Sequence, residues 1–316
     1  MQSPDTSVTY GGPRAAVATI SGSSLWGLGD GFAAFAQERG CQLLGVHRPM
    51  TPYGLGPQLE HYQSTNGRPF LRIPSYGMVA DEDWLERRAE WKVFWLLWQA
   101  GVRVLVIGGT SGTCDWRDSD DAIRPGDLVL PWSYISLDAM PTGLPGTQLE
   151  SVLAERVPLM SDPFCPTLAT AFCAEVAARK PAPFRRIHGQ DEHVILNRWH
   201  YGAFESVGQA LLLRHFGQSV GCPVITGDCV SPPLARVCGM HVLYYHIPSN
   251  WAEGLRPHDL TWTLDRVYIE QLPTVVGELE LSVLAQVEEP TDCRCRELLR
   301  PRPPEYRLAL SPRIAP

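Results

Sequence analysis

The chain has 316 residues, of which 44% are hydrophobic, and a formal net charge of −7. This length and composition suffice to bury a large core in a single α/β domain. The acidic balance argues against nucleic acid or an anionic membrane surface as a partner, because both attract basic faces, so we expect a small-molecule ligand.

The cysteines indicate a reducing compartment, and the apolar runs are too short for a membrane-spanning segment. Nine cysteines, odd in number and irregularly spaced, lie mostly inside apolar runs, which is typical of thiols kept reduced in the cytoplasm. Cys293 and Cys295 form a C-x-C pair, but no second ligand pair accompanies it, so we expect no metal site. No apolar run reaches the roughly 18 residues that a membrane span needs, and no secretory signal pattern is present. We therefore expect a cytoplasmic protein without a membrane partner.

The first hundred residues alternate between strand and helix patterns. Short apolar runs predict the strands, and an apolar stripe through Trp91, Trp95 and Trp98 predicts the longest helix. In chain order we expect a strand at 15–20, a small-residue turn at 21–24, a helix at 31–38, strands at 42–46 and 69–73, and a helix at 84–100.

The stretch 102–130 carries the most informative pattern in the chain. An apolar strand runs into Gly108, Gly109 and Gly112, and a second strand follows a Pro-Gly-Asp sequence at 125–127. We expect a glycine-rich turn at the strand's end, where the absence of Cβ atoms lets backbone N–H groups approach an anionic or planar polar ligand. A plain tight turn between core strands is the alternative. The spacing matches neither a P-loop nor a dinucleotide-binding fingerprint.

The second half of the chain continues the alternation. We expect helices at 164–179, 205–216 and 233–238, a last helix within 260–286, and strands at 194–196, 223–226 and 240–246. Strands alternating with helices predict an α/β fold with a largely parallel sheet. We place one domain at residues 1–288 and a loosely ordered Pro/Arg-rich tail at 289–316.

Seven stretches of the sequence resemble one family in the family's own order. They are ATISGSSL, MTPYG, VLVIGGTSG, IRPGDLVLP, MSDPFCP, GAFES and YHIPSN. Together they resemble the trimeric purine nucleoside phosphorylases and their methylthioadenosine phosphorylase branch, over residues 15–286. The resemblance implies a single α/β domain built around a mixed, distorted β-barrel surrounded by helices, assembled as a homotrimer.

The same resemblance implies the chemistry. These enzymes cleave the N-glycosidic bond of a purine nucleoside by attack of phosphate on the sugar, using phosphate as a co-substrate and no metal or organic cofactor. Charge moves onto the purine as the bond breaks, so groups that hydrogen-bond the base must bind the transition state more strongly than the substrate. A donor-rich pocket must also hold phosphate against the sugar.

The resemblance places the base and sugar subsite. Phe204 is expected to stack by the base, Glu205 to accept hydrogen bonds from the purine edge, and Asn250 to face purine N7. Glu205 and Asn250 together favour a 6-oxopurine. The other expected substrate contacts are Ser249, Thr226 and His258. The alternatives are that Glu205 merely begins a helix and that Asn250 is a turn residue.

The phosphate subsite departs from the family. The expected contacts are Ser23, Ser24, Ser75, Tyr76, Gly109 and Thr110. Ser75 and Tyr76 stand where the family has Arg and His, so the guanidinium fork best suited to phosphate is lost. Lys92 or Arg88 could supply a cation from another direction. Three outcomes stay open: phosphorolysis at a rebuilt anion site, hydrolysis or transfer to another nucleophile, or a fold kept for binding alone.

Overall fold

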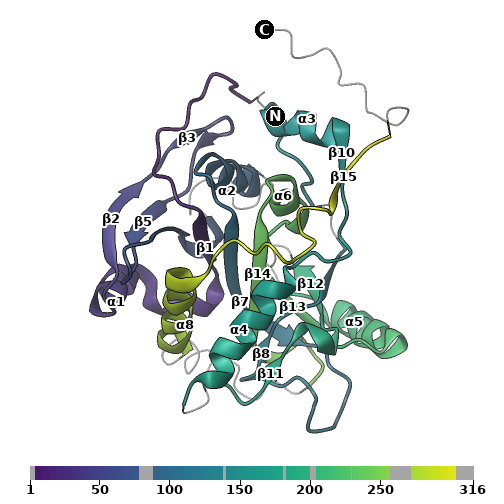
Figure 1. The fold of residues 1–316 in the computed structure, drawn as a ribbon. Helices are drawn as coiled ribbons and strands as arrows, with labels where there is room; N and C mark the ends of the chain where they lie inside the picture. Colours follow the sequence, from purple (N-terminus) through teal and green to yellow (C-terminus); the bar gives the residue numbers. More distant parts are fainter. Residues whose placement is uncertain are drawn as a thin grey trace.

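The computed structural model describes residues 4–77, 88–137, 140–180, 183–199, 204–228, 230–256 and 272–303. Within these ranges, one mixed sheet runs through the molecule and helices cover both of its faces (Figure 1). Its main path has the strand order β11-β8-β14-β7-β1-β6-β5-β2, and β13, β12 and β9 branch from the far part of β7. Among the described residues, no helix is both long enough and apolar enough to span a bilayer.

The strands of this sheet, and of two small ribbons beside it, have these bounds: β1 (Val17–Ser21), β2 (Gln42–His47), β3 (Met50–Thr51), β4 (Gly54–Leu55), β5 (Leu59–Gln63), β6 (Pro69–Ile73), β7 (Val104–Thr113), β8 (Leu128–Val129), β9 (Ser133–Ser136), β10 (Arg156–Pro158), β11 (Ile187–His188), β12 (Ile195–Trp199), β13 (Val224–Asp228), β14 (His241–Trp251) and β15 (Leu299–Pro301).

The helices have these bounds: α1 (Phe32–Glu38), α2 (Arg88–Gln99), α3 (Gln148–Glu155), α4 (Pro166–Ala178), α5 (Val207–Val220), α6 (Pro232–Val237) and α8 (Leu272–Gln286), with short 3₁₀ segments η1 (Ser23–Gly31), η2 (Pro74–Gly77) and η3 (Gln190–Glu192).

The central strand β7 shows how the sequence builds a sheet that is buried on both faces. Leu105 and Ile107 point into a core completed by α2 and α6, whereas Val104 and Val106 point into a core completed by α1, α4 and α8. Successive side chains of a strand face opposite ways, so a continuous apolar run is what a doubly covered parallel strand requires. Each such buried aliphatic side chain contributes about 1.5–3 kcal/mol.

The expected α/β architecture with a mixed sheet among helices is confirmed, with one difference in the sheet. Strand β7 pairs in parallel with β1 and β14 and antiparallel with β13. No pairing among the described residues joins β2 to β9 or β11, so the described sheet is open rather than a closed barrel.

The expected glycine-rich turn after β7 is wrong. The strand continues through Gly108, Gly109 and Gly112 to Thr113, because β14 accompanies it over its whole length. Glycine is required there by neighbouring side chains: a Cβ on Gly108 would lie 2.1 Å from the hydroxyl oxygen of Tyr245. The glycines thus permit close approach within the sheet instead of reversing the chain.

Two boundaries of α5 also differ from expectation. The helix begins after Ser206, whose side chain and that of Gln209 form a capping box, and it ends at Gly221, which has a φ of 72°. Gly217 lies inside the helix and does not stop it. A Cβ on Gly217 would lie 2.8 Å from the carbonyl oxygen of Cys222, so this glycine serves close packing.

The segment after α8 is folded onto the body of the protein as far as it is described. Strand β15 pairs antiparallel with β10, and the Leu159 N–H donates to the Leu298 carbonyl at 2.7 Å. The expectation of a loosely ordered tail therefore does not hold for residues 289–303. The remainder of the expected tail lies outside the described residues.

Candidate active site

The candidate site begins where β1 and β6 end, beside the middle of the longer strands β7 and β14. In the sheet register, Gly108 of β7 lies beside Ser21 of β1, and Gly109 lies beside His246 of β14. The Gly22 N–H donates to the Gly108 carbonyl at 3.0 Å and fixes the chain as it leaves β1. The carboxyl ends of parallel strands meet at one edge of a sheet, which is where α/β proteins place their ligands.

Three of the expected phosphate contacts are in direct contact with one another. The hydroxyl oxygens of Ser23 and Thr110 are 2.8 Å apart, and the Thr110 N–H donates to the Ser23 Oγ at 2.9 Å. The Ser23 N–H donates to the Tyr76 hydroxyl oxygen at 3.2 Å. The structure thus brings Ser23, Thr110, Gly109 and Tyr76 into one small cradle of neutral polar groups.

The Tyr76 hydroxyl fills this cradle. A Cβ built on Gly22 would lie 2.1 Å from that oxygen, and one on Gly109 would lie 2.7 Å from it. The hydroxyl therefore stands between the two glycine backbones, where their lack of side chains leaves room for one polar atom. Tyr76 is buried, so its phenol belongs to the interior of the site rather than to its rim.

The backbone that carries Tyr76 is strained. Ser75 and Tyr76 have φ values of 48° and 56°, in the left-handed region that non-glycine residues rarely adopt. Such conformations cost about 1–3 kcal/mol each, and they concentrate at functional sites where surrounding structure holds them in place. The loop places the phenol in the cradle and leaves Ser75 on the wall of the neighbouring cleft.

That cleft has a volume of about 610 Å³ and lies between η1 and the ends of β5 and β6. Its wall includes Arg72, whose Nε donates to the Ser21 Oγ at 2.9 Å and whose Nη1 lies 2.8 Å from a carboxylate oxygen of Glu60. The guanidinium group also stacks over the Phe32 ring at 3.8 Å. Because Glu60 balances its charge, Arg72 brings a donor network rather than a free cation to this side of the site.

The other cations considered for phosphate are placed differently. Lys92 is buried on α2, with its Nζ 3.9 Å from the position that a Cβ on Gly54 would take, so it packs under the turn between β3 and β4. The side chain of Arg88 lies outside the described part of the chain. Ser24 is buried next to the Tyr245 hydroxyl, one residue past the cradle.

The expected base contacts gather around Gly112 at the far end of β7. Asn250 of β14 and Thr226 of β13 lie in register on either side of Gly112. A Cβ on Gly112 would lie 3.4 Å from the Glu205 Oε1, so the carboxylate lies directly over this glycine. Glu205 is 4% exposed, and its carboxylate accepts the Glu253 N–H at 3.2 Å.

Among the described residues, the Asn250 side chain hydrogen-bonds only to its two sequence neighbours. Its amide nitrogen donates to the Trp251 carbonyl at 2.9 Å, and its amide oxygen accepts from the Ser249 hydroxyl at 3.0 Å. Strand β14 has an irregularity in its pairing between Pro248 and Asn250, which shifts the side-chain alternation at this point. Ser249 itself is buried against β7.

Two expected substrate contacts are not brought into the site. The Phe204 side chain is 79% exposed, so within one chain it forms no wall over Gly112. His258 lies outside the described residues.

The structure adds two polar residues that the sequence pattern did not single out. Asn197 of β12 lies in register with Thr226, is fully buried, and has no hydrogen-bond partner for either amide atom among the described residues. His246 is buried beneath Gly109, with its Nδ1 3.1 Å from the Thr110 carbonyl and its ring stacked on Tyr244. Asn197 directly follows the apolar run 194–196, and that position is the one sequence signal that could have drawn attention to it.

A buried carboxyl group lies behind the cradle. Glu280 of α8 accepts from the Tyr245 hydroxyl at 2.7 Å and from the Thr19 hydroxyl at 3.2 Å. Burial raises the pKa of Glu280 to about 7, although these hydrogen bonds and the charge of Arg72 oppose the shift. Through the Tyr245 hydroxyl, which lies against Gly108, this carboxyl group supports the Gly108 segment.

Comparison with solved structures places this arrangement in a known fold. A methylthioadenosine phosphorylase from an antarctic soil metagenomic library superimposes with a TM-score of 0.61 and 16% identity, covering 94% of this chain and 96% of that one. The chain has the nucleoside phosphorylase fold. A Schistosoma mansoni purine nucleoside phosphorylase in complex with adenosine has a TM-score of 0.57 and 15% identity, covering 87% of this chain and 92% of that one.

A third structure with this fold, the Schistosoma mansoni methylthioadenosine phosphorylase in complex with adenine, has a TM-score of 0.60 and 17% identity over 86% of this chain and 91% of that one. No protein-family model and no curated protein matches the sequence. At these identities the nucleoside phosphorylase fold is retained while most side chains have changed.

Proposed function

We propose that this chain cleaves the N-glycosidic bond of a purine nucleoside, a 6-oxopurine or a 5′-modified one, with phosphate as the acceptor. The observation that carries the proposal is the convergence of Glu205, Asn250 and Thr226 on Gly112, at the end of the central strand. These residues come from three segments distant in sequence; the motifs GAFES and YHIPSN predict that Glu205 and Asn250 contact the base, and Thr226 is expected as a further substrate contact.

The chemistry of this cluster fits a purine leaving group. As the glycosidic bond breaks, negative charge develops on the base, and a donor near N7 stabilises it. Among the described residues, the Asn250 amide hydrogen-bonds Ser249 and Trp251; it can rotate to present its NH₂ group, and the Glu205 carboxylate can accept from the purine edge. Asn197 adds an amide with both donor and acceptor capacity in the same register row.

The cradle is the proposed acceptor subsite. Ser23 and Thr110 supply hydroxyl and N–H groups, and Gly109 leaves the backbone open to an oxyanion. Phosphate would enter from the cleft that contains Arg72 and Ser75. Binding requires the Tyr76 hydroxyl to move from between Gly22 and Gly109.

A second candidate function is favoured by that same hydroxyl. Because Tyr76 already takes the Ser23 N–H, a neutral phenol satisfies the cradle without any anion. This arrangement suits transfer of the sugar to water or to another nucleophile. We place it second because it leaves the donors of Thr110 and Ser23 without a role in catalysis.

We also propose that the chain acts as a homotrimer in the cytoplasm. Helix α5 exposes Val207, Leu211 and Leu212, each about half exposed, beside the 79% exposed Phe204. A contiguous exposed apolar strip marks an interaction surface, and a neighbouring copy seated there would cover Phe204 near the base subsite. Sedimentation equilibrium should give three times the chain mass of 35.1 kDa.

A nucleoside panel assayed with and without phosphate tests the function. Inosine, guanosine, adenosine and methylthioadenosine are incubated with the protein, and free base, free pentose and pentose 1-phosphate are quantified by chromatography. Phosphorolysis predicts base and pentose 1-phosphate in equal amounts, only when phosphate is present. Base with free pentose in phosphate-free buffer supports the second candidate, and tight nucleoside binding without base release contradicts both.

A further inference from the structure

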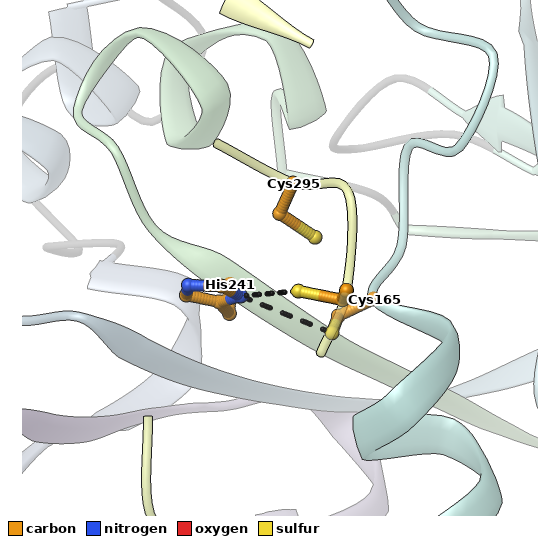
Figure 2. Close-up of side chains that lie close together, drawn as sticks. Cys165, His241 and Cys295 are labelled. Carbon is orange, nitrogen blue, oxygen red and sulfur yellow. Dashed lines mark hydrogen bonds between the residues drawn. The ribbon is translucent and has the colours of Figure 1, made fainter. Parts of the chain in front are cut away.

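Four potential metal ligands meet at the start of β14, at the other end of that strand from Asn250. Figure 2 shows Cys165, which precedes α4, and His241, the first residue of β14, beside Cys295 of the segment after α8. Cys293 joins them, and the four ligand atoms all lie within 4.8 Å of one another. Ligand spacing in the sequence does not indicate this group, because the other two ligands, Cys165 and His241, lie more than 50 residues before the C-x-C pair.

The measured distances approach those of a tetrahedral metal centre. The His241 Nδ1 is 3.2 Å from the Cys293 Sγ and 3.9 Å from the Cys165 Sγ. Zinc bound by thiolates at about 2.3 Å and imidazole at about 2.0 Å brings ligand sulfur and nitrogen to about 3.6 Å of each other, and two sulfurs to about 3.8 Å. The two printed separations need shifts of a few tenths of an ångström, and no pair of ligand atoms is more than 4.8 Å apart, so side-chain adjustments of up to about 1 Å would enclose the ion.

The backbone around the cluster is held by contacts that do not involve the thiols. The Arg236 Nη1 donates to the Cys295 carbonyl at 2.6 Å, and its Nη2 donates to the Asp162 carbonyl, so one buried guanidinium joins the two cysteine-bearing segments. The Cys165 N–H donates to the Val242 carbonyl at 2.8 Å. The ligands are thus carried on fixed backbone before any metal is bound.

The charge and outer contacts also suit a metal. Three thiolates and one imidazole around a divalent cation carry a net charge of −1, and Arg236, Arg103 and Arg296 line the adjoining cavity of about 280 Å³. The His241 Nε2, on the other side of the ring from the cluster, lies 3.6 Å from a Glu289 carboxylate oxygen. Carboxylates in this position orient ligating histidines and make them more basic.

We propose that Cys165, His241, Cys293 and Cys295 bind one structural Zn²⁺ ion that fastens the segment 289–303 to β14 and α4. Three sulfurs and one nitrogen form a closed set with no position left for water or substrate, which is typical of structural rather than catalytic zinc. Asn250 lies nine positions along the extended strand from His241, about 30 Å, so the ion takes no part in the proposed glycosidic chemistry.

The first test is the metal content of the purified protein. Elemental analysis should find one zinc per chain, and replacement by Co²⁺ should give the intense visible bands of a tetrahedral site together with thiolate-to-cobalt charge transfer. Cys293→Ser and Cys295→Ser should each lose stoichiometric zinc. Cys173→Ser is the matched control, because that half-buried thiol lies within α4, the helix that Cys165 precedes, but outside the cluster.

A variant that replaces no ligand tests zinc binding even if the cysteine variants fail to fold. Glu289→Gln leaves all four ligands in place and should weaken zinc binding about 10- to 100-fold, as loss of an outer carboxylate does. Chelation should also make the segment 289–303 the first site of proteolytic cleavage in the wild type, and to the same extent in Cys173→Ser, which keeps all four ligands.

Three results would overturn the proposal. The first is a folded wild type that takes up neither zinc nor cobalt. The second is a disulfide among Cys165, Cys293 and Cys295, found by peptide mapping of protein purified without reductant. The third is zinc that stays stoichiometric in Cys293→Ser and Cys295→Ser.

Discussion

Tyr76→His should convert the filled cradle into an open phosphate site. The phenol hydroxyl takes the Ser23 N–H at 3.2 Å and lies between Gly22 and Gly109, whereas imidazole is shorter and carries no hydroxyl. Histidine also tolerates the left-handed backbone at this position better than most residues. The replacement therefore frees a backbone donor and the space beside it.

The size of the effect follows from the hydrogen bonds involved. A bond from a neutral donor to a charged acceptor contributes about 1.5–3 kcal/mol, so regaining the Ser23 N–H should lower the KM for phosphate by about 10- to 100-fold. Loss of the buried phenol contact should cost about 1 kcal/mol of unfolding free energy. That loss is small enough for the variant to remain folded.

The assay is the initial rate of base release as phosphate concentration is varied, with unfolding followed by circular dichroism. Tyr10→His is the control, because the Tyr10 hydroxyl donates to the Pro13 carbonyl, away from the cradle. If the wild type proves indifferent to phosphate, Tyr76→His should acquire a phosphate-stimulated rate. A folded Tyr76→His variant whose phosphate response matches that of the wild type would refute the placement of the acceptor subsite.

Three further predictions concern single residues. Glu205→Ala should lower kcat/KM at least ~100-fold with an unchanged unfolding midpoint, while Glu150→Ala on α3 leaves turnover intact; equal kinetics for the two variants would remove Glu205 from the site. Glu280 is buried with its pKa raised to about 7 from 4.5, so its ionisation destabilises the fold as pH rises through this interval. Glu280→Gln should therefore become more stable than the wild type as pH rises. The difference between their unfolding free energies, measured by urea titration, should grow by about 2.5 kcal/mol from pH 5 to pH 8. A difference that does not change with pH would contradict this. Gly22→Ala would place a Cβ 2.1 Å from the Tyr76 hydroxyl and should lower stability by about 1–3 kcal/mol in thermal unfolding, whereas Gly31→Ala meets no atom within 4 Å and should be neutral.

Much of the fold could be predicted because its signals are local. The apolar run that became β7 and the capped helix α5 carry periodicity and end signals that tertiary packing reinforces. What failed was the interpretation of glycine. The sequence predicts a turn at Gly108 and the end of a helix at residue 216, just before Gly217, yet both glycines lie inside regular elements. Only the folded structure shows the Tyr245 hydroxyl and the Cys222 carbonyl that exclude a side chain there.

The candidate site was predictable only where residues follow a motif. Glu205, Asn250 and Thr226 were found through their motifs or their place at a strand end, and the sheet register brings them together. Asn197 was missed because a lone polar residue in a strand has no spacing to mark it. Tyr76 fills the cradle because Ser75 and Tyr76 both have left-handed backbone conformations, and no pattern of side chains predicts these conformations.

The same limit applies to the cysteine cluster. Cys165, His241 and the C-x-C pair are separated by more than 120 residues from first to last, and tertiary contacts such as the β10–β15 pairing and the Arg236 hydrogen bonds bring the last segment to the others. Ligand spacing detects metal sites that lie within one loop or hairpin. It cannot detect a site whose ligands come from distant segments that the tertiary fold brings together.

The central claim is tested most directly by following pentose 1-phosphate with ³¹P NMR while inosine or methylthioadenosine is consumed. The wild type should form one pentose 1-phosphate for each purine released, and Glu205→Ala should form neither. Purine release by the wild type without a phosphorylated sugar would contradict phosphate as the acceptor. Full activity in Glu205→Ala would contradict the site itself.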